Sequence, residues 1–150
     1  MLEDTIPTQG QLASEFRTIL EQLDQFAHQA VAHRRKFQFA CSQFKQFTET
    51  FDTYATNDEL TQEQIDAYKF VYKSAKELQE LFNRYSLQCW VHFALEQRSS
   101  EVPTELCTIA AQLKEHTACL CEEASQYFDS NAPQWLQYHI LDIRAIHSSF

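Results

Sequence analysis

The fold is decided by residues 75–120, AKELQELFNRYSLQCWVHFALEQRSSEVPTELCTIAAQLKEHTACL. A helical pattern runs into a dense apolar segment at residues 87–95, a polar break follows at residues 98–103, and a second long amphipathic pattern begins after the break. Pro103 suits the first turn of that second helix, where its missing N–H is not needed. The other segments are predicted to be helices that pack against this pair.

The composition indicates an all-α protein. Only one glycine and three prolines occur in 150 residues, and the Asn-Gly and Asp-Gly pairs that favour hairpin turns are absent. Hydrophobic residues make up 44% of the chain, including twelve phenylalanines, so a packed interior is available. A chain of this length is the size of one domain. We therefore predict a single helical domain over residues 1–150.

Two helices are predicted in the first third of the chain. Apolar residues at helical spacing predict one helix from residue 8 to about residue 31 and a second from Phe37 to Tyr54. One continuous helix over both would be about 70 Å long, too long for a globule of this size unless it projects or dimerises. We therefore expect a turn or a kink between Val31 and Lys36.

The third helix has the clearest start. Thr61 and Gln64 are spaced as a capping box, in which each side chain bonds the other residue's free backbone N–H. Leu60 and Ile65 occupy the flanking positions of a hydrophobic staple. Helical spacing of apolar residues then continues to Asn83 or Tyr85.

The second half of the chain completes the bundle. Residues 87–95 predict a short helix that closes one end, and residues 98–103 predict a loop. Apolar residues from Leu106 to Phe128 continue at helical spacing, and residues 129–133 form a connector. The last helix has an apolar stripe of Trp135, Leu136, His139, Ile140, Ile143, Ile146 and Phe150. This order predicts an antiparallel four-helix bundle with an additional short helix and a C-terminal helix.

The charge of the chain argues against some partners. A formal charge of −9 opposes nonspecific binding to nucleic acid or anionic lipid. The exception is one compact basic patch, His33, Arg34, Arg35 and Lys36, which is a candidate contact for a lipid or a protein partner through a phosphate or carboxylate. The alternative is a helix end exposed to water.

Cysteines and hydropathy favour a cytoplasmic protein. The five cysteines are odd in number, and four lie on or near apolar helical faces, as expected for reduced thiols. Cys119 and Cys121 cannot share a helical face, and His116 with Cys119 supplies only two ligands, so no metal site is predicted. The N-terminus has no basic start followed by an apolar run, and no run of 18 apolar residues occurs, so we expect neither secretion nor a membrane span.

No motif indicates catalysis. The chain has no HExxH motif, no Glu-x-x-His pairs of the di-iron kind, no P-loop and no Gly-rich loop. His139 lies in the last apolar stripe, where a hydrogen-bonded core or edge histidine is favoured over a catalytic or phosphotransfer one. We therefore expect no enzyme activity and no cofactor. Partly exposed aromatic side chains would favour a protein partner or self-association.

Residues 75–86, followed by Trp90 and the pattern from Leu106 to Leu120, resemble the N-terminal four-helix bundles of the adaptor Cbl type. The bundles of mixed lineage kinase domain-like (HeLo-like) pseudokinases and of many tyrosine-kinase-like kinases are similar. Asp142-Ile143-Arg144-Ala145-Ile146 resembles the last helix that often precedes the kinase part. The resemblance covers most of the chain and implies a regulatory module that binds partners and self-associates, or one that oligomerises and disrupts membranes, as in the necroptosis executioner.

The sequence departs from this family in two respects. The kinase domain that the resemblance leads us to expect is not among these 150 residues, which an excised domain would explain, and a charge of −9 lacks the broad basic surface expected for acidic lipids. We favour a non-catalytic, cytoplasmic interaction domain from the N-terminal part of a kinase-like signalling protein. The alternatives are a membrane-permeabilising bundle that uses residues 33–36 as its lipid contact, and a small acidic inhibitor that acts by charge mimicry.

Overall fold

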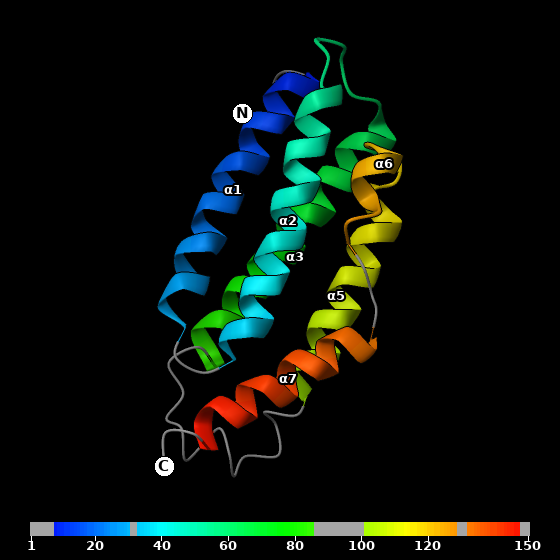
Figure 1. Cartoon of the computed structure of the whole chain (residues 1–150). Helices are drawn as coiled ribbons and strands as arrows, with labels where there is room; N and C mark the ends of the chain where they lie inside the picture. The colour runs from blue at the N-terminus through cyan, green and yellow to red at the C-terminus, as the bar shows by residue number, and fades with distance from the viewer. Residues whose placement is uncertain (1–7, 31–32, 86–100, 129–131, 148–150) are drawn as a thin grey trace.

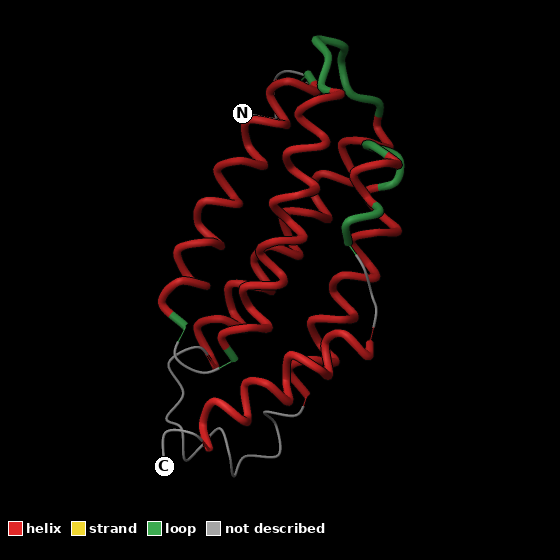
Figure 2. Tube along the Cα trace, viewed as in Figure 1, coloured by secondary structure: helices red, strands yellow, loops and turns green. Residues whose placement is uncertain are grey.

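The computed structural model describes residues 8–30, 33–85, 101–128 and 132–147. Its helices are α1 (Gln9–Gln29), α2 (Arg34–Tyr54), α3 (Gln62–Tyr85), α5 (Val102–Thr117), α6 (Glu122–Ser125) and α7 (Ala132–His147). Over these ranges the structure has no strand, only an isolated β-bridge between Thr8 and Glu59 (Figure 2). The all-α prediction is confirmed, whereas the short helix predicted at residues 87–95 lies outside the described residues.

Helices α1, α2, α3 and α5 form the bundle, and α7 crosses one end of it (Figure 1). Successive long helices run in opposite directions. Helix α1 contacts α2 and α3, and α5 contacts the same two helices, so the four close into a ring. Helix α7 packs on α2 and α5.

Phenylalanine side chains fill the centre of the ring. Phe16 of α1 is fully buried, and its ring lies 5.3 Å from both Phe47 and Phe51 of α2. On α3, Phe82 is also fully buried and lies 4.3 Å from Phe37 of α2, centroid to centroid. Since aromatic rings bury large areas and attract each other edge to face, this cluster explains why a chain rich in phenylalanine forms a single core.

Local hydrogen bonds fix two helix starts at the same end of the bundle. In the predicted capping box, the Gln64 N–H donates to Thr61 Oγ1 at 3.2 Å and the Thr61 N–H donates to Gln64 Oε1 at 2.9 Å. A second box, which was not predicted from the sequence, is formed by Thr8 and Gln11 at the start of α1. The Gly10 N–H also donates to the Thr56 carbonyl, which ties the start of α1 to the α2–α3 connection.

The turn expected between Val31 and Lys36 is confirmed. Helix α1 ends at Gln29 and α2 begins at Arg34. Between them His33 adopts a left-handed conformation, with φ 58° and ψ 23°. Left-handed backbone cannot continue a right-handed helix, so His33 separates two helices that share one apolar pattern.

The helical pattern from Leu106 to Phe128 does not form one helix. Helix α5 ends at Thr117, whose carbonyl accepts from the N–H groups of both Leu120 and Cys121. Cys121 is extended, and the short α6 follows. An uninterrupted helix would carry Phe128 about 16 Å beyond Thr117 along the axis. The break instead brings Phe128 to 4.9 Å from Phe47 of α2, so core packing overrides the local pattern.

Helix α7 starts at Ala132, inside the connector predicted at residues 129–133, and it buries a narrower face than its apolar pattern predicts. Trp135, His139 and Asp142 point inward and are 1%, 7% and 5% exposed. Leu136 and Ile140, which were predicted to share the buried stripe, are 54% and 42% exposed. An ion pair as well as apolar contact orients the helix, because Asp142 faces inward toward the buried Lys36 cation.

Candidate functional site

The basic patch predicted from the sequence divides into a buried half and an exposed half. His33 is 1% exposed and Lys36 is fully buried. Arg34 and Arg35, in the first turn of α2, are exposed at the surface. Two of the four predicted contact residues are therefore inside the protein and are covered in this conformation.

Lys36 meets a carboxylate of its own chain. Its ammonium Nζ lies 2.7 Å from Asp142 Oδ2 of α7, and the aspartate side chain is 4% exposed. Asp142 Oδ1 accepts the backbone N–H of Arg35 at 3.1 Å and lies 3.5 Å from the Arg35 guanidinium. One carboxylate from the last helix thus binds the first turn of α2 at three points.

Asp142 performs the task of a helix cap. The residue at the N-cap position of α2, His33, makes no side-chain capping bond. The first N–H groups of a helix have no partner inside it, and negative charge is favoured at that end of the helix dipole. Asp142 supplies both the acceptor and the charge from a position 107 residues along the chain.

Burial shifts the titration of this cluster. It lowers the pKa of Lys36 to about 8, against the opposing attraction of Asp142. Burial, together with the nearby Lys36 cation, lowers the pKa of His139 to about 4. The His139 ring stacks on His33 at 6.2 Å and 15° between planes. At neutral pH the cluster therefore contains a charged lysine, and His139 is a neutral imidazole.

The cluster is suited to holding α2 and α7 together and not to binding a substrate. A lysine of lowered pKa is the usual nucleophile for carbonyl substrates. Here, however, the side chain of Lys36 has no exposed surface, so no substrate reaches its Nζ atom in this conformation. Nearby, the space that Trp135 helps to line is about 10 Å³, at the lower limit for a single water and too small for a substrate.

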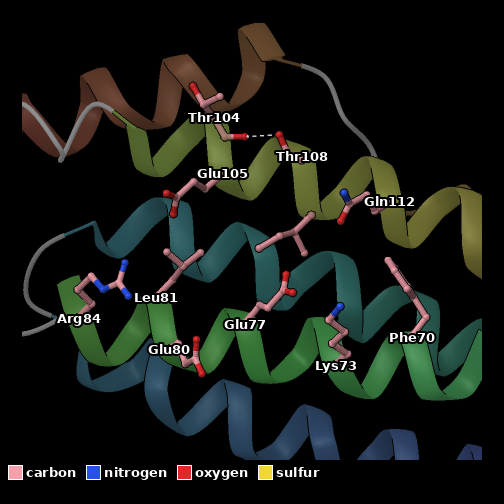
Figure 3. Close-up of a pocket in the computed structure, with 11 residues that line it drawn as sticks. Phe70, Lys73, Glu77, Glu80, Leu81, Arg84, Thr104, Glu105, Thr108 and Gln112 are labelled. Carbon is pink, nitrogen blue, oxygen red and sulfur yellow. Dashed lines mark hydrogen bonds between the residues drawn. The ribbon is translucent and has the colours of Figure 1, made fainter.

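An open groove of about 530 Å³ lies between α3 and α5 (Figure 3). Its floor includes Leu81 and Ile109, which are buried. Its walls are charged: Glu77 and Glu80 come from α3 and Glu105 from α5, together with the cations Lys73 and Arg84. This site was not predicted, because two helices form it and the sequence of neither helix indicates that they pair.

A second hollow of about 500 Å³ continues the groove toward the other end of α3. Phe70 lines both hollows, and its ring stacks on that of His116 at 3.8 Å. The second hollow adds three carboxylates, those of Glu63, Asp66 and Glu115. Together the two hollows make one long acidic face on α3 and α5, which we call the α3–α5 groove.

The cysteines near this groove form no metal centre with their neighbours. Across residues 8–30, 33–85, 101–128 and 132–147, no three His, Cys, Asp or Glu side chains lie close enough to share a metal ion. Cys119 is close to the Glu63 and His116 carbonyls, and burial raises the pKa of its thiol. A thiol of raised pKa is a poor ligand and a poor nucleophile.

None of the described helices is both long enough and apolar enough to cross a bilayer.

No protein-family model, curated protein or solved structure matches the chain. Function is therefore inferred from the bundle's own surfaces.

Proposed function

We propose that this chain is a non-catalytic helical module that binds another protein through the α3–α5 groove. The groove itself carries the proposal, because it combines a large volume and an apolar floor with charged walls. A desolvated apolar centre with a polar rim is the usual anatomy of a protein interface.

Two carboxylates support this role. Glu77 and Glu105 are half-buried on opposite walls of the groove (Figure 3), and neither makes a hydrogen bond or an ion pair with another described residue. Half-buried charge without a partner gains little for the fold. A partner that brings a complementary charge would recover the cost of that partial burial.

The placement of the module in a kinase-like signalling protein of the cytoplasm rests on the resemblance to adaptor Cbl and mixed lineage kinase domain-like bundles. Membrane permeabilisation through residues 33–36 has weaker support. His33 and Lys36 are buried, so only Arg34 and Arg35 would face a lipid surface. Two cations add about 2 kcal/mol of attraction at an anionic bilayer, too little for stable anchoring.

Affinity capture from cell extract tests the proposal with three baits: the native chain, Glu77→Lys/Glu105→Lys in the groove, and Glu21→Lys/Glu49→Lys. The last pair lies on exposed positions of α1 and α2, so it changes net charge equally and leaves the groove intact. We expect a partner that the native and control baits retain and the groove bait loses. An identical set of proteins on all three baits, or none on any, would contradict the proposal.

A further inference from the structure

The occupant of the groove is inferred from its dimensions, its charge and its apolar floor, and the inference rests on the function proposed above. The lining residues of α3 run from Phe70 to Arg84 in the first hollow, and the second hollow extends the lining back to Glu63. At 1.5 Å per residue these spans are about 21 and about 32 Å long. A helix of four to six turns has this length and fits a groove between two packed helices.

The charge of the lining selects the chemistry of that helix. The groove is lined by six carboxylates and two cations, Lys73 and Arg84. Its acidic residues lie on both walls, so a cation between them is attracted from two sides. Nucleic acid and acidic peptides would be repelled from the same surface.

The floor indicates that the occupant is also apolar on one face. Leu81 and Ile109 are buried but border the groove, and Phe70 is half-buried at the junction of the two hollows. An amphipathic helix places apolar residues on such a floor at spacings of three and four, with its charged residues at the edges.

From these observations we propose that the α3–α5 groove binds a cationic amphipathic helix of a partner protein, with Lys or Arg side chains placed against Glu77, Glu80 and Glu105. Because Glu77 and Glu105 line the groove from opposite walls, cations along the partner helix meet carboxylates on both sides. The acidic residues of the second hollow then meet basic residues two to three turns further along the same helix.

The test uses labelled peptides of about 18 residues, five helical turns, in which leucine forms one face and lysine or glutamate the other. Binding is measured by fluorescence anisotropy against the intact chain. We expect the lysine peptide to bind, its dissociation constant to rise between about 50 and about 300 mM salt, and the glutamate peptide not to bind.

Variants separate the groove from the general acidity of the chain. Glu77→Lys/Glu105→Lys should weaken binding of the lysine peptide by at least about tenfold, whereas Glu21→Lys/Glu49→Lys, with the same net charge, should change it less than about twofold. Circular dichroism verifies that each variant is folded. Equal weakening by both variants would mean nonspecific attraction and would overturn the inference.

Backbone amide shifts of the labelled protein locate the complex and separate the two proposals. Shifts on α3 and α5 with the lysine peptide alone support the inference. Shifts on the same helices with the glutamate peptide would retain the groove as a docking surface and reject the cationic partner. Shifts elsewhere, or none with either peptide, would contradict the cationic helix in this groove, while the extract experiment decides the broader function independently.

Discussion

Two charged regions of this protein use the same kinds of side chain in opposite ways. At the α2–α7 contact, Lys36 and Asp142 are enclosed and paired at 2.7 Å. In the α3–α5 groove, Glu77 and Glu105 are only half-buried and have no partner among the described residues. The first arrangement fixes two helices to each other, and the second leaves charge available to another molecule. Burial and pairing, rather than residue type, distinguish a structural cluster from a binding surface.

The largest expected effect tests the buried pair. Asp142→Asn leaves the Lys36 ammonium buried without its carboxylate and removes the charge at the start of α2. We expect a loss of about 3–5 kcal/mol in the free energy of unfolding, measured by urea denaturation. The exposed neighbour Arg34 provides the control, because Arg34→Ala should cost no more than about 0.5 kcal/mol.

A double variant tests the reason for that loss. Lys36→Met/Asp142→Leu replaces the pair with apolar side chains and should recover most of the stability lost in Asp142→Asn, since no uncompensated charge stays in the core. If the double variant is as unstable as the single one, the capping bond to the Arg35 N–H matters more than the ion pair. A single variant within about 1 kcal/mol of the native chain would show that the cluster is not structural.

The next effect is a pH dependence. The folded pKa of His139 is about 4 and its ordinary value is 6.5, so between these values the unfolded chain binds more protons than the folded one. Stability from His139 is therefore complete above about pH 6.5 and is lost as the pH falls toward 4. We expect about 2 kcal/mol of loss from pH 7 to pH 5.

His139→Gln isolates this contribution from other acid titrations. The titratable groups near the ring include His33 at the N-cap of α2, Lys36 of α2 and Asp142 of α7 itself. The variant should show a smaller drop in unfolding free energy between pH 7 and pH 5 than the native chain. Parallel pH profiles for the two proteins would mean that His139 accepts a proton freely in the folded state.

The smallest expected effect is the change in the free energy of unfolding when the groove carboxylates are neutralised. Glu77→Gln/Glu105→Gln removes two charges that bind nothing within the described structure, so the free energy of unfolding should change by less than about 0.5 kcal/mol. Thermal denaturation of the two proteins side by side measures this. A loss above about 1 kcal/mol would mean that the groove carboxylates hold the bundle together, and the contrast between the two regions would fail.

The contacts that could be predicted from sequence are local, although the equally local box at Thr8 and Gln11 was missed. The capping box at Thr61 and Gln64 spans three residues, and its hydrogen bonds were predicted and confirmed. The helix predicted from Leu106 to Phe128 was wrong at Thr117, because a contact with α2 decides where Phe128 lies. Periodicity describes a single helix, and it contains no information on which other helix a side chain meets.

The same limit applies to the two charged regions. An acidic residue in the apolar stripe of the last helix, Asp142, was a signal that something cationic lies opposite it. The patch at residues 33–36 contained that cation, but the two segments are separated by about a hundred residues in sequence, and no pattern links them. The groove gave no signal, since the charges of α3 and α5 resemble those of any solvated helix face.

The bond from the Arg35 N–H to Asp142 has a consequence for biosynthesis. The acceptor is translated 107 residues after the donor, on the order of 10 s later at ordinary elongation rates. A nascent chain that has released α1, α2 and α3 from the ribosome therefore still lacks the carboxylate that completes the first turn of α2. That turn should stay open to exchange and to proteases until the last helix emerges.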